Sequence, residues 1–417
     1  MSDRLQAPRG TYDVLPEAAA ARTALETTAR RVLEGAGYRR IETPTFESTE
    51  VFARGVGAST DIVQKEMYTF DDGGGRSVTL RPEGTAPICR AYAEHGMHKL
   101  PQPVKLWYLS SFFRQEKPQA GRYRQFWQIG AEALGSDDPA VDAEAILLLA
   151  TLLEELEVGG LRLRLSSLGT PEARAAYRDD LATHLRENAD RLSPDVRARI
   201  DLNPLRAFDS DHPGTREVMA SAPLLLNRLD AADAEHFAAV RELLDGAELD
   251  YEVDPTLVRG LDYYTRTVFE FTSDALGAQS GVAGGGRYDG LVAMLGGPAT
   301  PGCGWAAGVE RMLLAATQLP VAPAPVDLFV AFEGPHARAM AFGVTTEARS
   351  ARLNAQMELA GRSRKGQLKQ ADRLGARYVA VLDDDGGAVL KDMSSGEQLE
   401  VAAAEVVARV LRDRGMR

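Results

Sequence analysis

Apolar and polar residues follow a helical spacing in the first part of the chain. Residues 17–36 are rich in alanine and end at Gly35 and Gly37, which predicts an amphipathic helix. The next segment, 38–46, has the composition of a strand that closes near Pro44, because proline lacks the N–H that further pairing needs. The chain is therefore expected to begin with a helix and a short strand.

Strand-like alternation dominates the next part of the chain. Residues 66–80 alternate around the turn DDGGGR and predict a hairpin, and a helix is expected over 85–93. Further strands are expected at 104–114 and 123–133, joined by the polar loop 115–122. Because these strands follow one another as hairpins, the pattern favours an antiparallel sheet over a doubly wound parallel one.

The pattern changes after residue 171. Alanine, arginine, leucine and acidic residues recur at helical spacing over 172–248, which predicts a helical insertion. Strand patterns return at 257–272, and a helix is expected from about 305 to 317. The proline-rich stretch 318–326 is typical of a linker, and strands then alternate with helices over 326–417 as βα units.

Composition restricts the class of protein. A chain of 417 residues is too long to fold around a single hydrophobic core, so two or three domains are expected. Its content of 44% hydrophobic and 26% charged residues is ordinary for a globular protein. No run approaches the roughly 18 apolar residues that cross a bilayer, and residues 1–16 lack the apolar region of a secretory signal. Cys89 and Cys303 lack metal-type spacing, so neither a zinc site nor a disulfide framework is expected. The low cysteine content fits a protein of the reducing cytoplasm.

Charge is distributed unevenly. The net charge of −12 argues against binding of nucleic acid, DNA included, over the whole surface. Between Arg349 and Arg377, however, eight basic residues accompany only Glu358 and Asp372. This segment could contact phosphates, and on charge alone a solvated helix face explains it equally well.

Three segments carry arginines in chemically suggestive settings. They are FFRQEKPQAGRYRQFWQIGAEALG at 112–135 with Arg114, Arg122 and Arg124, LVRGLDYYTRTVFEF at 257–271 with Arg259, and GWAAGVERM at 304–312 with Arg311. The planar guanidinium suits phosphate and carboxylate oxygens, so several converging arginines would form a triphosphate site. Taken singly, each is more often a surface or salt-bridge residue. The chain has no GxxxxGK[ST], which excludes a P-loop, and no GxGxxG opening a helix after a strand, which argues against a dinucleotide fold.

The local setting of these residues is also predictable. Arg259 is expected between apolar strand residues, with no evident carboxylate partner in the sequence. Arg311 is expected on a helix whose small residues allow close backbone approach. Singly, the pair Tyr263–Tyr264 is most simply core packing, and GGGRYDG at 284–290 a hairpin turn.

In their order along the chain, these segments resemble one family. PRGTYDVLP, the helix and strand closing at Pro44, FRQE through GAE, and GVER resemble the N-terminal segment and the three motifs of histidyl-tRNA synthetases, which are class II aminoacyl-tRNA synthetases. LRPEGT, RGLDYY and GGGRYDG resemble segments peculiar to the histidine enzymes, and 361–378 resembles their anticodon-binding domain. Ser280, Gly281 and Trp305 depart slightly from the family pattern.

The resemblance implies an α+β fold: a class II antiparallel catalytic sheet flanked by helices, with a helical insertion and a C-terminal α/β domain. The domains implied are 1–171 (catalytic, first two motifs), 172–250 (insertion, expected to hold tRNA), 251–320 (catalytic, third motif) and 326–417 (anticodon-binding). The family and the apolar face of 17–56 lead us to expect a homodimer in the cytoplasm, with no membrane contact.

The resemblance also implies a set of site residues. Arg114 and Arg259 would act in catalysis by holding the α-phosphate and the histidine carboxylate. ATP binding is implied for Arg114, Glu116, Arg122, Phe126, Arg259 and Arg311, and Mg²⁺ is expected to arrive with ATP rather than in a protein metal site. Histidine binding is implied for Glu83, Gly84, Thr85, Gln128, Glu132, Tyr263, Tyr264 and Tyr288. Contact with tRNA is implied for Gln119, Arg362, Arg364, Lys365 and Lys369.

The chemistry of the substrate agrees with these residue types. An imidazole offers one donor and one acceptor, which Glu132 and Tyr264 can match with support from Tyr288. A structural salt bridge to an arginine is the alternative role for Glu132. Because the amino-acid carboxylate is already ionised, activation needs no general base. A non-catalytic regulatory paralogue in histidine biosynthesis is the alternative function, but such paralogues lack the C-terminal domain that this chain carries.

Overall fold

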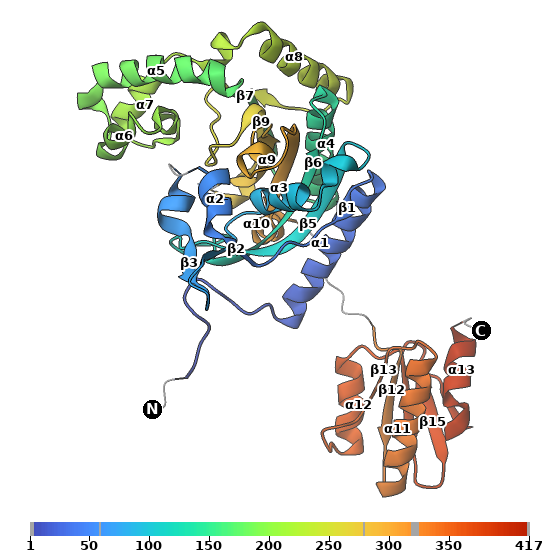
Figure 1. The fold of residues 1–417 in the computed structure, drawn as a ribbon. Coiled ribbons are helices and arrows are strands. Elements are labelled where there is room, and N and C mark those ends of the chain that lie inside the picture. The colour runs from blue at the N-terminus through green and yellow to red at the C-terminus, as the bar shows by residue number, and fades with distance from the viewer. Residues whose placement is uncertain (1–3, 58–59, 278–279, 318–324, 415–417) are drawn as a thin grey trace. The chain divides into compact units, whose positions relative to one another are not determined.

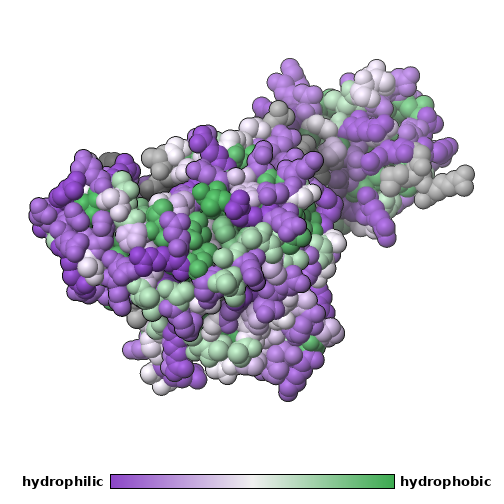
Figure 2. All heavy atoms as spheres, turned by 90° about the horizontal axis from the view of Figure 1, so that it is seen from above, coloured by the Kyte–Doolittle hydropathy of each residue, from purple (hydrophilic) through white to green (hydrophobic). Residues whose placement is uncertain are grey.

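The chain forms two compact units, Met1–Pro320 and Val321–Arg417 (Figure 1). The structure, a computed structural model, describes residues 4–57, 60–277, 280–317 and 325–414. The expected linker, 318–326, lies mostly outside these ranges. None of the helices in the described ranges has the length and apolar character needed to cross a membrane. On the face seen in Figure 2 most of the surface is hydrophilic, with hydrophobic residues in smaller patches.

An eight-stranded sheet forms the centre of the first unit. Its strands, in spatial order, are β1 (Arg39–Arg40), β5 (Val104–Phe113), β6 (Gln125–Leu134), β11 (Gly302–Gly308), β10 (Gly281–Arg287), β9 (Thr265–Ser273), β7 (Leu161–Ser167) and β8 (Glu252–Val253). The two outermost pairs are parallel and all inner pairs are antiparallel. The predicted antiparallel sheet is therefore confirmed for the strands that matter to the site.

Both faces of this sheet are covered. Successive strand residues point to opposite faces, so Trp107 and Tyr108 of β5 enter two different hydrophobic cores. The Trp107 core includes residues of α1 (Pro16–Gly35), α4 (Pro139–Glu155), α8 (Ala231–Gly246) and α10 (Val309–Ala315). The Tyr108 core includes residues of α3 (Thr85–Glu94), α5 (Pro171–Glu187) and α9 (Leu291–Met294). The helices expected at 17–36 and 85–93 correspond to α1 and α3.

A small three-stranded sheet contains, in spatial order, β2 (Phe46–Ser48), β4 (Ser77–Leu80) and β3 (Tyr68–Asp71). The predicted hairpin over 66–80 is confirmed, and Asp72 fixes its turn by accepting from the backbone N–H groups of Gly74 and Arg76. The single strand predicted over 38–46 is wrong, because β1 and β2 belong to different sheets. Pro44 lies in the segment between them, which belongs to neither strand. The helix α2 (Thr49–Gly55), the π-helix η1 (Ile62–Glu66) and the 3₁₀ turn η2 (Met97–Lys99) complete this region.

The stretch between β7 and β8 is entirely helical apart from its connections, as predicted for the insertion (green in Figure 1). It contains α5, α6 (Pro194–Arg199), α7 (Pro213–Met219), α8 and the turns η3 (Ala189–Arg191), η4 (Pro204–Asp209) and η5 (Leu225–Arg228). Proline begins α5, α6 and α7, and the residue before each proline accepts a backbone N–H of the first turn. The domain boundaries at 171, 250 and 320 stay predictions.

Three local predictions in the second half of the first unit are wrong. The strand expected at 257–272 begins only at Thr265, so Arg259 lies in a loop. The helix expected from 305 begins at Val309, and GWAAG belongs to strand β11. GGGRYDG is no simple hairpin turn, because its first three glycines lie in the inner strand β10. Glycine and alanine have little intrinsic preference for strands, and here close packing decides, since a Cβ on Gly285 would overlap the backbone of β11. The turn η6 (Asp274–Leu276) follows β9.

The second unit contains a five-stranded sheet in the order β13 (Ala355–Met357), β12 (Leu328–Phe332), β14 (Tyr378–Leu382), β15 (Gly387–Asp392), β16 (Gln398–Ala402). The pairs that involve β12 are parallel, and the others are antiparallel. With α11 (Pro335–Ser350) and α12 (Arg364–Arg373), the predicted βα alternation is confirmed. The hairpin of β15 and β16, the turn η7 (Ala403–Glu405) and α13 (Val406–Asp413) were not anticipated in the sequence pattern.

Candidate active site

A cavity of about 490 Å³ lies in the first unit and gathers most of the predicted site residues. Those that line it are Glu83, Gly84, Thr85, Arg114, Glu116, Arg122, Phe126, Gln128, Arg259, Tyr263, Tyr264 and Arg311. They come from four segments of the chain, 83–85, 114–128, 259–264 and Arg311. The order of β5, β6, β11, β10 and β9 in the sheet helps to bring these segments together. Glu132 and Tyr288 are not among the lining residues, but they are buried and hydrogen-bonded to one another.

Glu83 is fixed at the start of α3. Its two carboxylate oxygens accept the backbone N–H groups of Thr85 at 2.8 Å and Ala86 at 3.0 Å, and the Tyr263 hydroxyl lies 3.5 Å from Oε2. Burial raises the pKa of Glu83, while these N–H donors and Arg114 act in the opposite direction. A buried carboxylate held in this way is oriented for a cationic ligand such as an α-ammonium group.

Glu132 is fully buried and bound by hydroxyl groups. Thr85 Oγ1 donates to its Oε1 at 2.8 Å, and the Tyr288 hydroxyl donates to its Oε2. Burial raises the pKa of Glu132 to about 8, which the two hydroxyl donors partly offset. These partners differ from the salt bridge to an arginine that was the alternative role. A carboxyl group near its titration point can change its protonation state when a ligand arrives.

Aromatic residues surround these carboxyl groups. The ring centroids of Tyr263 and Tyr264 are 4.8 Å apart, and those of Tyr263 and Tyr288 are 5.8 Å apart in an edge arrangement. All three rings are buried. Tyr263 and Tyr264 therefore pack in the core, which is the simplest role that the sequence suggested for them. They also line the cavity.

Tyr108 is a lining residue that the sequence reasoning missed. Its ring lies against Gly84 and against Gly130, its antiparallel partner on β6, where a side chain would collide with it. Within the described residues its buried hydroxyl has no hydrogen-bond partner, and neither has the buried Oε1 of Gln128. Open polar atoms of this kind are the groups that a bound ligand satisfies. The available signal in the sequence was a tyrosine in one predicted strand and a glycine, Gly130, in the next, which together allow a ring to lie over the neighbouring strand.

The arginines approach the cavity from several elements. Arg114 Nε donates to the Pro82 carbonyl at 2.9 Å, and its guanidinium lies 5.2 Å from the centroid of the Phe126 ring. Arg122 lies 3.7 Å from the Glu116 carboxylate. Arg311, on α10, donates from Nε to the Gly281 carbonyl of β10. A guanidinium carries five N–H donors, so Arg114 and Arg122 can offer further N–H groups to an anion.

Arg259 has a carboxylate partner, so the prediction that it has none is wrong. Its Nη1 lies 2.9 Å from Glu270 Oε1 on β9. Gly284 leaves room for the guanidinium, because a Cβ there would lie 2.5 Å from Arg259 Nη2. Arg259 Nε is buried and has no partner within the described part of the chain. Glu270, also missed, was visible as one polar position in the apolar run TVFEF.

Arg206 and Asp209 of η4 also line the cavity, so the insertion contributes to its wall. Their side chains form an ion pair at 2.9 Å, and burial raises the pKa of Asp209. No spacing or motif in the helical stretch pointed to these two residues. They line the cavity because the insertion contacts the loop 257–264, a contact that the sequence pattern does not reveal.

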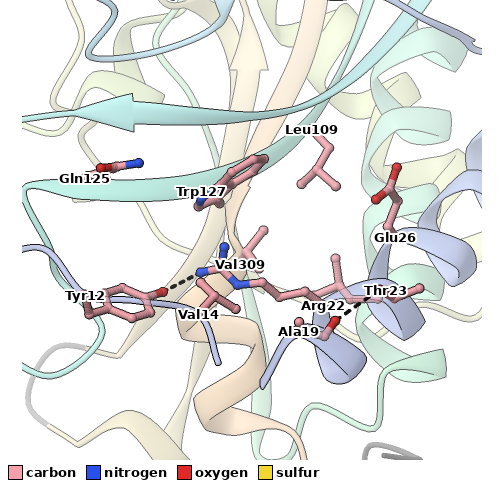
Figure 3. Close-up of a pocket in the computed structure, with 11 residues that line it drawn as sticks. Tyr12, Val14, Ala19, Arg22, Thr23, Glu26, Leu109, Gln125, Trp127 and Val309 are labelled. Carbon is pink, nitrogen blue, oxygen red and sulfur yellow. Dashed lines mark hydrogen bonds between the residues drawn. The ribbon is translucent and has the colours of Figure 1, made fainter. Parts of the chain in front are cut away.

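A second cavity, of about 420 Å³, borders the same helix α10 (Figure 3). Beside it Glu310 accepts from the Tyr12 hydroxyl at 2.8 Å, from Arg22 at 2.6 Å and from the Trp127 backbone N–H at 3.0 Å. Arg22 also donates to the Tyr12 hydroxyl, the bond drawn dashed in Figure 3. The N-terminal segment PRGTYDVLP is thereby tied to the residue that precedes Arg311.

The residues predicted to contact tRNA are not among those that line the cavity. Gln119 is exposed in the loop between β5 and β6, where its backbone pairs with that of Arg122. The others, all exposed on or beside α12 in the second unit, are Arg362, Arg364, Lys365 and Lys369. Among the described residues, no group of three or more His, Cys, Asp or Glu side chains is arranged to hold a metal ion.

Comparison with known proteins decides the family. The family described as histidyl-tRNA synthetase matches residues 10–312, which contain every residue that lines the cavity. The chain belongs to the histidyl-tRNA synthetase family. It is 45% identical over 411 residues to the histidine–tRNA ligase of Halothermothrix orenii, with 97% of this chain and 98% of the relative covered. It is 50% identical over 398 residues to that of Halorhodospira halophila, with 93% of each covered.

Solved structures of the histidyl-tRNA synthetase family agree with the fold. The crystal structure of apo S. aureus histidyl-tRNA synthetase superimposes with a TM-score of 0.82 at 34% identity, and the match covers 98% of this chain and all of the other. The predicted class, α+β with an antiparallel catalytic sheet and a C-terminal α/β domain, is confirmed.

Proposed function

We propose that the protein is a histidine–tRNA ligase. It activates L-histidine with ATP to histidyl-adenylate, releases pyrophosphate, and transfers the histidine to the 3′ end of its tRNA. The observation that carries the proposal is one cavity in which arginines from three distant segments face a buried carboxyl group set among tyrosines. The near full-length similarity to histidine–tRNA ligases supports the same reaction.

Activation is an in-line displacement at phosphorus. A carboxylate oxygen of histidine forms a bond to the α-phosphorus of ATP, and the bond from that phosphorus to the bridging oxygen of pyrophosphate breaks. The nucleophile is already ionised, so the residues only need to orient the reactants and stabilise the developing charge. We assign this work to Arg114 and Arg259. Glu270 holds Arg259 in place by its contact at 2.9 Å.

ATP would occupy the arginine-rich part of the cavity. Arg122 and Arg311 suit the β- and γ-phosphates, Phe126 offers an aromatic surface to adenine, and Glu116 can accept from its amino group. Mg²⁺ enters as part of the substrate, bound to ATP, and screens the phosphate oxygens that the arginines leave uncovered.

Histidine would occupy the carboxyl and tyrosine part of the cavity. Ionised Glu132 accepts the imidazole N–H and the Tyr264 hydroxyl donates to the other ring nitrogen, while Tyr288 holds Glu132. The α-ammonium group is assigned to Glu83, Thr85 and Gln128, beside Gly84 and Tyr263. A site that hydrogen-bonds its substrate can reject analogues by about 10⁴–10⁵-fold, so no editing domain is required.

The tRNA would be held by several parts of the chain. Gln119 lies two residues before Gly121 and three before Arg122, both of which line the cavity. The helix α12 carries Arg364, Lys365 and Lys369, and Arg362 lies just before it. We further propose a homodimer in which α1 and the β2 region meet their counterparts, since Leu15 is 62% and Phe46 is 53% exposed there. A place in the cytoplasm follows from the proposed role in protein synthesis.

ATP–pyrophosphate exchange with a panel of all twenty amino acids tests the function. We expect exchange with histidine alone. Exchange with another amino acid would reassign the substrate. Complete absence of exchange, in a protein that binds ATP, would instead favour the non-catalytic regulatory alternative.

A further inference from the structure

The helical insertion contacts the backbone of the histidine pocket from outside the cavity. Arg174, on α5, donates from Nη1 to the backbone carbonyl of Tyr264 at 2.7 Å. The Tyr264 side chain lines the cavity, whereas Arg174 is not among the lining residues. A residue of the insertion is therefore bonded to the peptide group of a residue assigned to the imidazole.

The backbone just after Tyr264 is irregular. The pairing of β9 with β10 jumps between Thr265 and Val268, which leaves Arg266 in a bulge. Arg266 has a φ of +45°, in the left-handed region that residues other than glycine rarely adopt. Such a conformation persists only where the surrounding structure holds it.

The insertion supplies the groups that hold this bulge. Arg266 Nε donates to Asp233 Oδ1 at 2.9 Å, and Asp233, on α8, is fully buried. The other oxygen of Asp233 accepts the Thr170 N–H at 2.7 Å, and the Arg266 N–H donates to the Gly169 carbonyl at 2.8 Å. The start of α5 and the start of α8 are thus joined to the strand at one point.

We propose that Arg174 and Asp233 are positioning residues for histidine recognition, which act through the backbone of Tyr264 and Arg266. The inference rests on the proposed function, because Tyr264 is assigned to the imidazole there. Hydrogen bonds weaken steeply when donor and acceptor are misaligned, so a shift of the Tyr264 peptide weakens the bond from its hydroxyl. Arg114, Arg122 and Arg311 lie outside β9 and its bulge. Arg259 is held by Glu270, whose pairing with Gly284 lies beyond the register shift, so only a small effect on ATP binding is expected.

The test uses the full-length protein and the variant Arg174→Met, which keeps an unbranched side chain but removes the donors. Pyrophosphate exchange gives the KM for histidine and for ATP separately, and thermal unfolding gives the Tm. We expect the KM for histidine to rise about tenfold, the loss of roughly one aligned hydrogen bond, and the KM for ATP to stay within twofold. The matched control is Arg178→Met, one turn later on α5, where the arginine donates to the Leu202 carbonyl within the insertion.

Two further variants keep the inference testable if Arg174→Met is unstable. Arg174→Lys can still donate to the Tyr264 carbonyl and should restore the KM for histidine to within about threefold of the parent. Asp233→Asn removes the charge that faces Arg266 and should again raise the KM for histidine rather than that for ATP. Equal rises of both KM values, or a lower Tm with both KM values unchanged, would overturn the inference and leave these residues a purely structural role. A parent protein without histidine-dependent exchange would instead overturn the proposed function itself.

Discussion

Arg259 and Glu270 form an ion pair at 2.9 Å across the wall of the cavity, from a loop to the neighbouring strand. Glu270 also lies 3.4 Å from Arg164, which has a second partner in Asp254. The carboxylate therefore keeps one cation when the other is removed. Removing Arg259 therefore leaves no unpaired carboxylate here, so a variant at this position can test the reaction without disturbing the fold.

Arg259→Ala is accordingly expected to abolish activation and to leave the fold intact. Loss of one preorganised donor at a reacting phosphate typically costs about 10²–10³ in rate, and Arg259 is assigned two contacts. The measurement is pyrophosphate exchange, with circular dichroism to check the fold. Arg162→Ala, which breaks an exposed ion pair with Asp274, is the control. Exchange within tenfold of the parent would remove Arg259 from the catalytic assignment.

Glu132→Gln is expected to weaken histidine binding far more than ATP binding. The amide keeps an acceptor oxygen but, unlike Glu132, cannot become ionised when histidine binds. It therefore lacks the charge that strengthens this hydrogen bond, and the KM for histidine should rise by about tenfold or more. Glu144→Gln is the control, since Glu144 binds Lys105 on the other side of the sheet. Equal losses for both substrates would assign Glu132 a structural role.

The pKa of Glu132, raised to about 8 by burial, gives a pH dependence. The unfolded chain loses this proton near pH 4.5, whereas the folded protein keeps it up to about pH 8. The folded state therefore binds more protons in this window, and the contribution of Glu132 to the free energy of unfolding falls as pH rises from about 4.5 to about 8. Urea unfolding across this range should give a steeper decline for the parent than for Glu132→Gln. Parallel curves would mean that Glu132 titrates normally.

A chain that ends at Pro320 is expected to form histidyl-adenylate and to charge tRNA poorly. Every residue that lines the cavity precedes this point, whereas the second unit carries α12. Pyrophosphate exchange and tRNA charging are measured on the same preparation, and sedimentation checks its oligomeric state. Normal charging by the truncated protein would show that the second unit is not a tRNA contact.

Neutralising the basic residues near α12 in the full chain provides the companion variant. Arg362 and Arg364 have partners in Glu358 at 3.2 Å and Glu333 at 3.4 Å, so Lys365 and Lys369 should contribute most. Each lost phosphate contact should reduce the log–log salt slope of tRNA binding by roughly 0.7–0.9. An unchanged slope would contradict the assignment.

The protein is expected to sediment as a dimer at micromolar concentration. The exposed Leu15 precedes α1 and the exposed Phe46 begins β2, so charged substitution of both, Leu15→Glu with Phe46→Glu, should favour the monomer. Leu399→Glu in the second unit, also an exposed leucine, is the control. A parent protein that sediments as a monomer would refute the proposed dimer.

The sequence predicted the elements whose pattern is local and missed those that depend on distant packing. The helix at 17–36 and the hairpin at 66–80 have spacing and turn residues that act within a few positions. The strands β10 and β11 are rich in glycine and alanine, and they are strands because each fits closely against the other. No local signal carries that information.

The same distinction applies to the site. Motif residues such as Arg114, Gln128 and Arg311 were found because their segments resemble a family, and all three line one cavity. The partner of Arg259, the open hydroxyl of Tyr108 and the contacts of Arg174 depend on which strands and helices are neighbours. Such contacts become visible only when the sheet order is known.

The order of strands in the sheet has a consequence for synthesis of the protein on the ribosome. β6 ends at Leu134, but its neighbour β11 begins at Gly302, on the far side of the insertion. At about 5–20 residues per second, the roughly 170 residues between them take some 10–30 s to translate, during which one edge of β6 has no partner. An unpaired strand edge in a crowded cell favours misassociation. A slower translation rate across the insertion should therefore lower the yield of folded enzyme, and a chaperone that shields strand edges should act on this nascent chain before its active site exists.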